Sequence, residues 1–405
     1  MRITHISTAA AGGAGIAAFR LHQKLMKQPN IQSSFIQRFH LDKDFMDVNN
    51  IYEAPIGKAL SIRIRKKFNI HTEHYHWVRL KRFPSNYETI SFPTTSYRLE
   101  ELPIIKNADI IHLHWVAEFL NYPTFFKNIK KPIIWTLHDM NPFMGLFHYK
   151  DDVLKNQAIY RKYDEKAIIL KQKAIHKSNS LNIVSPSKWL MNLSESSQTF
   201  YAYPHYLIPN GLDISLYPLL EKKTEKEKQQ VDNNLKTILF VANGVEIHRK
   251  GFDLLASAIN KLNREDYNLI SVGGDKITIN SKINHIHYNY INDIKTLNSI
   301  YAAADLTILP SREDNLPNVM LESFANGTPV MSFSNGGMVE HVKTGENGIL
   351  LSEIGIEPLT QGLNDFLNNK YTFEEKEIRD YAINTFSDTI QTQKYIQLYK
   401  DILNR

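Results

Sequence analysis

The stretch from Leu309 to Val330 constrains the fold most, because it joins a buried strand, a polar loop and a helix. Leu306, Ile308 and Leu309 predict a buried strand over residues 306–309, and the polar residues 311–315 form the loop. Pro317 and the Asn326–Gly327 pair bound the helix, since Pro favours the first helical turn and Gly the position after the last. A helix start presents unpaired backbone N–H groups, so this loop is a candidate anion site.

Two carboxylates flank the loop. Asp314 lies within it, and Glu322 lies on the helix that follows. Backbone amides suit a phosphate, and carboxylates accept hydrogen bonds from sugar hydroxyls, so the stretch suits a ligand that contains both. The alternative is an ordinary strand–loop–helix unit in which Asp314 is only the helix N-cap.

The same succession of strand, loop and helix recurs along the chain. Residues 2–7 predict a strand, Ala9–Gly15 a small-residue loop and the residues up to Lys27 a helix, as at the start of a dinucleotide-type domain. The apolar runs 108–114 and 132–138 predict buried parallel strands, and each ends in His.

A second series of strands and helices begins at Thr237. Because 405 residues exceed one ordinary core, two domains are expected. We predict an α/β protein with two Rossmann-like, doubly wound domains that face each other across a cleft. The first covers residues 1–207, the second covers 208–388, and a last helix, 389–405, is expected to pack back on the first.

Composition excludes several classes of protein. The 42% hydrophobic and 22% charged fractions are those of a globular protein. There is no run of 18 apolar residues that would predict a transmembrane helix, and Met1–Ser7 predicts a strand rather than a signal peptide. The sequence contains no Cys, which excludes disulfides and thiolate metal sites. A cytoplasmic location is expected.

The formal net charge of +6 hides a basic cluster with interleaved aromatic residues. Such a cluster suits a membrane surface rich in anionic lipid, and it also suits nucleic acid. A solvated, charged helical hairpin is the third interpretation. We expect docking at the inner face of the plasma membrane and no nucleic-acid partner. The basic residues are Lys58, Arg63, Arg65, Lys66, Lys67, Arg79, Lys81 and Arg82.

A second charged segment, Glu221–Asn234, is nearly free of apolar residues. Without apolar side chains to bury, it has little to hold it against a core. We predict a flexible surface loop at the domain junction.

The sequence Arg249-Lys250-Gly251 lies between a predicted strand and a helix. Arg offers forked contacts, Lys a point charge and Gly close backbone approach, which together suit a pyrophosphate. Such turns are common, so the motif alone is weak. Together with Asp314 and Glu322 it predicts a two-part site for a nucleoside diphosphate.

Histidines mark the predicted strand ends of the first domain. His138 follows an apolar strand and has Asp139 beside it, while His112 and His114 alternate and so share one face. The alternative for His138 is a satisfied histidine at a strand end. No carboxylate is placed to complete a metal site with these histidines, and we predict no metal.

At these residues the chain resembles the retaining family-four glycosyltransferases of GT-B fold. The first half matches more loosely, through Gly12-Gly13-Ala14 and through Trp135–Tyr149, which resembles enzymes of colanic acid and O-antigen synthesis. The resemblance covers most of the chain outside residues 37–107. The matching segments of the second half are Ile208–Asp213, Arg249–Leu255, Leu297–Ser311, Asp314–Val330 and Gly336–Leu351.

The resemblance implies roles in the second domain. Glu322 would bind the ribose of a UDP- or GDP-sugar donor, and Lys250 would bind its diphosphate. The family usually has an Arg where Gly244 stands, so Arg249 would replace it or one cation would be missing. Neither a bound metal nor another cofactor is implied.

The loop between the two carboxylates would contact the donor sugar and phosphate through its amides. Its residues are Glu313, Asn315, Leu316 and Pro317. Asp314 stands where the family mostly has Glu, and Glu313 beside it is a candidate substitute.

In the first domain, the resemblance places His138 near the reacting sugar, and Gly12 and Gly13 where the first loop approaches the diphosphate or the sugar. The implied activity is transfer of a sugar, with retention, to a hydroxyl of a glycan or lipid-linked acceptor in bacterial surface polysaccharide synthesis. Alternatives are a non-catalytic GT-B partner of another transferase, a GT-B epimerase or phosphorylase, and an NAD-binding oxidoreductase. The last would need a fuller Gly fingerprint than Ala9–Gly15 offers.

Overall fold

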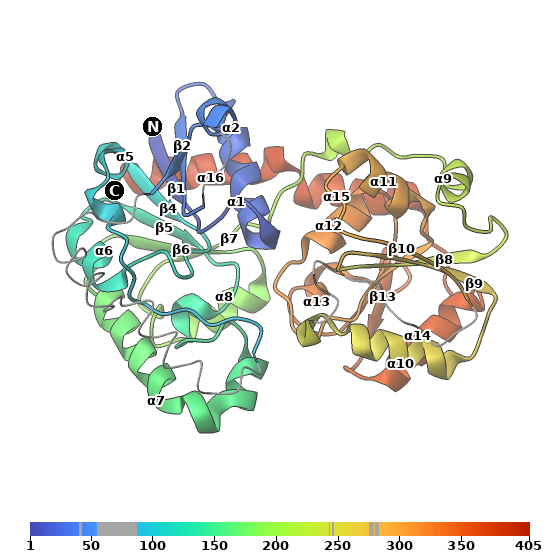
Figure 1. Cartoon of the computed structure of the whole chain (residues 1–405). Coiled ribbons are helices and arrows are strands. Elements are labelled where there is room, and N and C mark those ends of the chain that lie inside the picture. The colour runs from blue at the N-terminus through green and yellow to red at the C-terminus, as the bar shows by residue number, and fades with distance from the viewer. Residues whose placement is uncertain (40–42, 55–86, 243, 245–246, 275–278, 280–282) are drawn as a thin grey trace. The chain divides into compact units, whose positions relative to one another are not determined.

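The computed structural model describes residues 1–39, 43–54, 87–242, 244, 247–274, 279 and 283–405. The chain divides into two units, Met1–Ile208 with Gln391–Arg405 and Pro209–Ile390. Each unit is built on one parallel sheet with helices around it (Figure 1). Within the described ranges, no helix is both long enough and apolar enough to cross a membrane. The basic cluster from Lys58 to Arg82 lies outside the described residues.

The first unit has a seven-stranded sheet in the order β3-β2-β1-β4-β5-β6-β7. Helices α1 and α16 pack on one face, and α5, α6, α7 and α8 pack on the other. Both faces of the sheet are buried, and β4 and β5 are accordingly mostly apolar, whereas β1 and β2 also bury polar side chains. The strands are β1 (Arg2–Ile6), β2 (Gln32–Gln37), β3 (Ile51–Glu53), β4 (Ile110–Leu113), β5 (Ile133–Thr136), β6 (Leu181–Ser185) and β7 (His205–Leu207). The helices are α1 (Gly12–Met26), α2 (Lys43–Val48), α5 (Pro103–Asn107), α6 (Tyr122–Asn128), α7 (Lys150–Ile175), α8 (Lys188–Glu195) and α16 (Asp388–Leu403), with short turns η1 (Leu99–Glu101) and η2 (Asn141–Phe143).

The second unit has a six-stranded sheet in the order β10-β9-β8-β11-β12-β13. Helices α10 and α14 contribute to the apolar core on one face, and α11, α12 and α15 contribute to cores on the other. The strands are β8 (Lys236–Val241), β9 (Tyr267–Val272), β10 (Asn284–Tyr288), β11 (Leu306–Leu309), β12 (Val330–Phe333) and β13 (Gly348–Leu351). The helices are α9 (Lys222–Lys228), α10 (Phe252–Leu262), α11 (Ile294–Ala303), α12 (Asn318–Ala325), α13 (Met338–His341), α14 (Ile356–Leu367) and α15 (Glu375–Phe386), with turns η3 (Ile214–Leu216) and η4 (His248–Lys250).

Strand order reverses direction once in each sheet. In the first unit the reversal lies between β1 and β4, and in the second between β8 and β11. Open parallel sheets bind ligands at the carboxyl ends of the strands beside such a reversal. The predicted turn Arg249–Gly251 follows β8, and the predicted loop 311–315 follows β11. The fold therefore brings together two motifs that are about sixty residues apart in the chain.

The predicted flexible loop Glu221–Asn234 is wrong in its first half, where helix α9 forms. The Glu221 carboxylate accepts from the backbone N–H groups of Lys223 and Thr224 and so caps the helix. Lys226 is buried, and its ammonium donates to Asp305 and to the Leu235 carbonyl. The helix is held by polar contacts, which a search for apolar periodicity does not detect.

The predicted small-residue loop Ala9–Gly15 is too long at its carboxyl end, because α1 already begins at Gly12. A Cβ atom on Gly15 would lie 2.4 Å from the carbonyl oxygen of Ala9. Gly15 therefore allows the first helical turn to fold closely onto the loop that precedes it. The sequence prediction had selected Gly12 and Gly13 instead.

Candidate functional site

A cationic group occupies the carboxyl edge of the second unit's sheet. The ammonium of Lys250 donates to Oδ2 of Asp314 over 2.7 Å, and Arg249 lies 3.3 Å from the same oxygen. Arg249 also donates to the carbonyl of Glu313 over 2.9 Å. The three charged side chains are only 10–24% exposed. Two cations and one carboxylate leave a net charge of +1 in a largely buried site.

The charge state of this group follows from its surroundings. Burial acts to raise the pKa of Asp314, but the charges of Lys250 and Arg249 outweigh burial and hold that pKa below its usual value. The carboxylate is therefore ionised at neutral pH. An entering diphosphate would meet both cations and would compete with Asp314 for the ammonium of Lys250.

Glycines let three loops meet at this point. Gly251 has φ +72°, and a Cβ atom there would lie 1.8 Å from the carbonyl oxygen of Pro310. Gly336, with φ +55°, would place a Cβ atom 1.9 Å from the carbonyl oxygen of Asp314. The N–H of Gly337 donates to that same oxygen over 3.2 Å. The loops after β8, β11 and β12 are thus packed backbone to backbone, which only Gly permits.

Two further residues brace the loop, and the sequence prediction missed both. The backbone N–H of Arg312 donates to the carbonyl of Arg249, and its guanidinium donates to both carboxylate oxygens of Asp253 over 2.7 and 2.5 Å. The amide of Asn335 donates to the carbonyls of Ser311 and Arg312. The only sequence signal for Arg312 was its place inside the polar loop.

Glu322 lies on α12 and is buried. The hydroxyls of Tyr217 and Tyr301 lie 3.5 and 3.4 Å from Oε1 and Oε2 of its carboxylate. One tyrosine therefore contacts each oxygen and fixes the plane of the carboxylate.

The loop residues that lead to Glu322 are placed as follows. The N–H of Asn315 donates to Oδ1 of Asp314 over 3.1 Å, and Leu316 is buried. Pro317 is the N-cap of α12, and no side chain caps that helix start. The alternative interpretation of Asp314 as the helix N-cap is therefore wrong.

In the first unit, His138 follows β5 and is half-buried beside His114, with 3.3 Å between its Nε2 and Nδ1 of His114. Burial lowers the pKa of His138 to about 4, although the charge of Asp139 opposes this shift. Asp139 accepts hydrogen bonds from the indole of Trp115 over 2.8 Å and from Nδ1 of His148 over 2.5 Å. A small cavity borders these side chains. The sequence prediction named His138 and missed His148.

The two predicted glycines, Gly12 and Gly13, form the first turn of α1. Gly12 has φ +70°, and no heavy atom of the described residues would lie within 4 Å of a Cβ atom there. The described part of the chain thus leaves open space beside Gly12.

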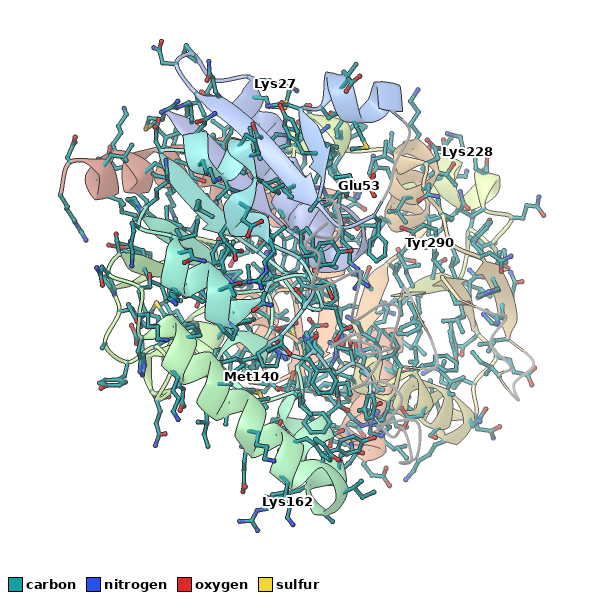
Figure 2. The ribbon with its side chains drawn as sticks, turned by 60° about the vertical axis from the view of Figure 1, so that its left-hand side comes forward. Lys27, Glu53, Met140, Lys162, Lys228 and Tyr290 are labelled. Carbon is teal, nitrogen blue, oxygen red and sulfur yellow. The ribbon has the colours of Figure 1, made fainter. Side chains whose placement is uncertain are left out.

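A buried lysine supports the loop that follows β5. Lys171 on α7 donates to the carbonyls of Asn141 and Gly145 over 2.6 and 2.7 Å, and to Oδ1 of Asn141 over 3.0 Å. Burial lowers the pKa of Lys171 to about 7. By contrast, Lys162 of the same helix, labelled in Figure 2, is exposed. The sequence does not predict these contacts of Lys171, because charge alone does not distinguish a buried lysine from an exposed one.

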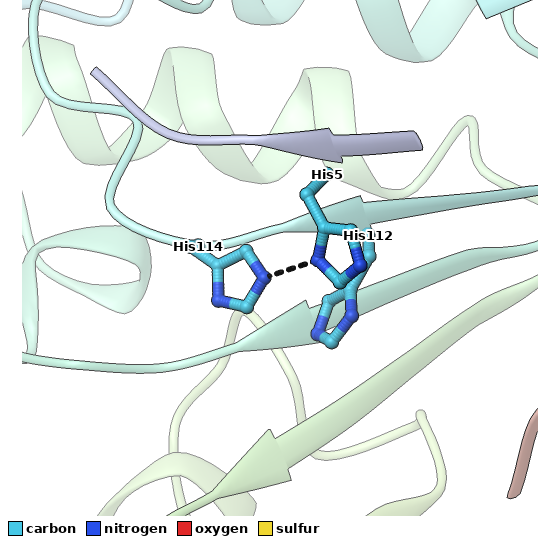
Figure 3. A group of neighbouring side chains, drawn as sticks. All are labelled: His5, His112 and His114. Atoms are coloured by element: carbon cyan, nitrogen blue, oxygen red, sulfur yellow. Dashed lines mark hydrogen bonds between the residues drawn. The ribbon is translucent and has the colours of Figure 1, made fainter. Parts of the chain in front are cut away.

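Three histidines gather on one face of the first unit's sheet. His5 on β1 pairs in register with His112 on β4, and His114 follows two residues later (Figure 3). Their ring nitrogens include one from each residue that lie within 4.8 Å of one another. Sequence reasoning had linked His112 and His114 and had not found His5, because the pairing of β1 with β4 is a tertiary feature. Neutral imidazoles in such a group could hold a metal ion such as Zn²⁺.

Residues 235–369 match the protein family described as "Glycosyl transferases group 1". This segment runs from β8 to α14 and includes Arg249, Lys250, Asp314 and Glu322.

Relatives of known name show the same likeness. A glycogen synthase of Thermodesulfovibrio yellowstonii is 26% identical over 226 residues, which cover 48% of this chain and 45% of that protein. A 41.2 kDa protein in the cps region of Klebsiella pneumoniae is 22% identical, covering 48% of this chain and 54% of its own length. A glycosyltransferase of Methanocaldococcus jannaschii is 26% identical over 321 residues, covering 73% and 74%. The chain spans about half the length of the first two.

Solved structures resemble the chain over its whole length. Sucrose-phosphate synthase from Thermosynechococcus elongatus gives a TM-score of 0.70 at 16% identity, covering 100% of this chain and 99% of its own. Anabaena HepE in complex with UDP gives 0.65 at 14% identity, covering 99% and 100%. The catalytic domain of Arabidopsis thaliana starch synthase IV, bound to ADP and acarbose, gives 0.63 at 15% identity, covering 100% and 99%. The chain therefore has two parallel-sheet α/β units of the kind found in GT-B glycosyltransferases, as predicted.

Proposed function

We propose that this protein is a glycosyltransferase that moves a sugar from a nucleoside-diphosphate sugar to an acceptor hydroxyl with retention of the anomeric configuration. The observation that carries the proposal is the buried group of Arg249, Lys250 and Asp314 at the strand-order reversal, within the segment that matches the group 1 family. Glu322, braced by two tyrosines, supplies the ribose contact. Solved structures of similar fold include complexes with UDP and ADP, which supports a nucleotide donor.

The chemistry follows from charge. The bond between the sugar C1 and the phosphate oxygen breaks as negative charge builds on the diphosphate, and Lys250 and Arg249 would stabilise that charge. The acceptor oxygen forms the new bond to C1 on the same face. Its proton passes to the departing phosphate oxygen. In this proposal Asp314 orients the two cations and does not act as a nucleophile, and a trapped covalent glycosyl-enzyme would contradict it.

A non-catalytic partner protein of the same fold is the competing function. A protein without activity would not need to keep all three of Lys250, Glu322 and His138, and this chain has them. The presence of all three favours the enzyme.

The test is a panel of UDP- and GDP-sugars measured by thermal shift and by slow donor hydrolysis. A ligand that binds only the folded state stabilises it by about 2.7 kcal/mol at one hundred times its Kd. We expect one donor to raise Tm and Glu322→Ala to abolish the shift. The control is Glu353→Ala, which removes an exposed carboxylate of the same unit. If no nucleotide sugar shifts Tm, the proposal fails.

The acceptor is proposed to be a glycan or a lipid-linked glycan of bacterial surface polysaccharide synthesis. The relative from a cps region supports this class. The basic cluster would then hold the protein at an anionic inner leaflet. Neutralising Lys66, Lys67, Lys81 and Arg82 should release the protein from anionic vesicles. Neutralising four exposed lysines of α7 should not, and equal binding by both variants would remove the membrane proposal. The control lysines are Lys155, Lys162, Lys166 and Lys173.

A further inference from the structure

Two buried histidines, His5 and His114, form a hydrogen-bonded chain that ends at the half-buried His138. Nδ1 of His5 lies 2.9 Å from Nε2 of His114, and Nδ1 of His114 lies 3.3 Å from Nε2 of His138. Figure 3 shows the first of these contacts, with the two rings pointing at each other across β1 and β4. His114 thus uses both of its ring nitrogens to connect the other two histidines.

The positions of the ring protons in this chain of histidines depend on one another. Burial lowers the pKa of His5 and of His114 well below the usual value, so these rings and that of His138 are neutral at physiological pH. A neutral imidazole has one donor nitrogen and one acceptor nitrogen. Both hydrogen bonds can therefore form in only two ways. Either every ring carries its proton on Nδ1 and the donors point from His5 to His138, or every ring carries it on Nε2 and they point back.

The far end of the chain distinguishes the two arrangements. Nε2 of His5 is buried and has no hydrogen-bond partner among the described residues. In the first arrangement Nε2 of His5 carries a lone pair that accepts no hydrogen bond. In the second it carries a buried N–H without an acceptor. Buried N–H groups without a partner are rarer in folded proteins than under-satisfied acceptors. The first arrangement is therefore the more stable one.

We infer that His5 and His114 are positioning residues that fix His138 as the Nδ1–H tautomer, so that His138 meets the sugar substrate as a hydrogen-bond donor. The substrate part of this inference rests on the proposed function. The lone pair of His138 on Nε2 is occupied by His114, so His138 does not take the acceptor's proton. It donates from Nδ1 to a sugar oxygen. This assignment agrees with transfer of the acceptor proton to the departing phosphate.

A metal ion would compete for the same nitrogens, and His112 argues against it. Nδ1 of His112 contacts the hydroxyl of Tyr399 at 2.8 Å, and Nε2 contacts that of Thr136 at 2.7 Å. Both nitrogens of the third ligand are therefore engaged. Binding a metal would break one of these contacts and also the contact between His5 and His114.

The tautomer can be observed without any substrate. Long-range ¹H–¹⁵N correlation spectra of the ¹⁵N-histidine-labelled full chain separate Nδ1–H from Nε2–H rings, and single His→Gln variants assign the signals. We expect Nδ1–H rings at His5, His114 and His138. A proton on Nε2 of His138 overturns the inference, and so does a stoichiometric divalent metal in the purified protein that His112→Ala removes.

Two substitutions at His5 separate positioning from packing. Gln can still donate an amide N–H to Nε2 of His114, whereas Phe cannot. Phe brings no polar atom into this buried position, while a buried Gln leaves polar atoms unpaired, so His5→Phe should have the higher Tm of the two variants. The Nδ1–H tautomer of His138 should be retained in His5→Gln, the less stable variant. In His5→Phe it should be mixed with the Nε2–H tautomer.

Activity completes the test. We expect kcat to be lower in His5→Phe than in His5→Gln by roughly three- to tenfold, the effect of one ordinary hydrogen bond. KM for the nucleotide sugar should be the same in both, because the second unit holds the nucleotide. If kcat is instead higher in His5→Phe, the variant with the higher Tm, His5 acts only through packing and the inference fails. If the tautomers are as expected but no donor is turned over, the proposed function fails and the tautomer assignment stands.

Discussion

The two units differ in the charge that they carry at the same place, the strand-order reversal of their sheets. In the second unit, the strand-order reversal carries two cations and an ionised carboxylate on loops that Gly251 and Gly336 bring together. In the first unit, the same place in the sheet carries neutral histidines whose charge burial suppresses. The difference fits our proposals that the second unit attracts an anion and that the first directs a hydrogen bond at an uncharged group. The following predictions test this contrast, in order of decreasing effect.

Lys250→Met should have the largest effect. In the proposed reaction it removes a cation placed where charge develops on the leaving diphosphate, and loss of one such donor typically costs about 2.7–4 kcal/mol, or 10²–10³-fold in kcat. Steady-state kinetics with the donor found in the panel would measure it. Lys261→Met is the control, since that lysine pairs with Glu357 at the surface of the same unit. A loss below tenfold would show that charge does not drive the second unit's chemistry.

Gly336→Ala tests whether close backbone packing builds the second site. The substitution forces both a strained φ and a clash with the Asp314 carbonyl, whereas Gly345→Ala imposes only the strained φ, +84°, in open space. We expect Gly336→Ala to be the more destabilising by about 1–3 kcal/mol, as for other overpacked positions. Urea unfolding of both variants measures the difference. Equal stabilities would mean that the loops can separate without cost.

Lys171→Met tests the corresponding support in the first unit. It leaves the carbonyls of Asn141 and Gly145 without a donor and should cost about 1–3 kcal/mol in the free energy of unfolding. The exposed Lys166→Met on the same helix is the control.

Lys171 also gives the wild type a pH signature. Its folded pKa of about 7 lies below the unfolded value of about 10.4, so between these values the unfolded chain binds more protons. This residue's contribution to stability therefore rises as pH increases from 7 to about 10. Chemical denaturation across that range should show a slope in the wild type that is smaller in Lys171→Met. Identical slopes would contradict the buried, mostly neutral lysine.

Tyr217→Phe should have the smallest effect. It removes one hydroxyl that lies 3.5 Å from Glu322, and a hydrogen bond of ordinary strength contributes about 0.5–1.5 kcal/mol. We expect a higher KM for the nucleotide sugar with kcat little changed, because the ribose is bound alike in the ground and transition states. Tyr301→Phe should behave the same way. A fall in kcat without a change in KM would remove Glu322 from the ribose role.

The sequence predicted more of the second unit's cationic group than of the first unit's histidine chain. Arg249, Lys250, Asp314 and Glu322 could be named because strand–loop–helix punctuation and charge are local signals. What it could not give was their pairing, since Lys250 and Asp314 are 64 residues apart. It also missed Arg312, which pairs with Asp253 on a helix 59 residues earlier in the chain, and Asn335, whose contacts are to backbone carbonyls. Helix α9 was missed because buried polar contacts, not an apolar stripe, hold it in place.

The sequence alone determined the architecture: alternating apolar strands and helices dictate parallel sheets, because only that pattern buries both faces of each strand. It also determined where charged loops would fall relative to strand ends. Only the tertiary structure decided which strands are neighbours. The pairing of β1 with β4 brings His5 to His112 and His114, and so creates the histidine chain that ends at His138. Register and burial are long-range properties, and they turn three scattered histidines into one neutral hydrogen-bonded chain.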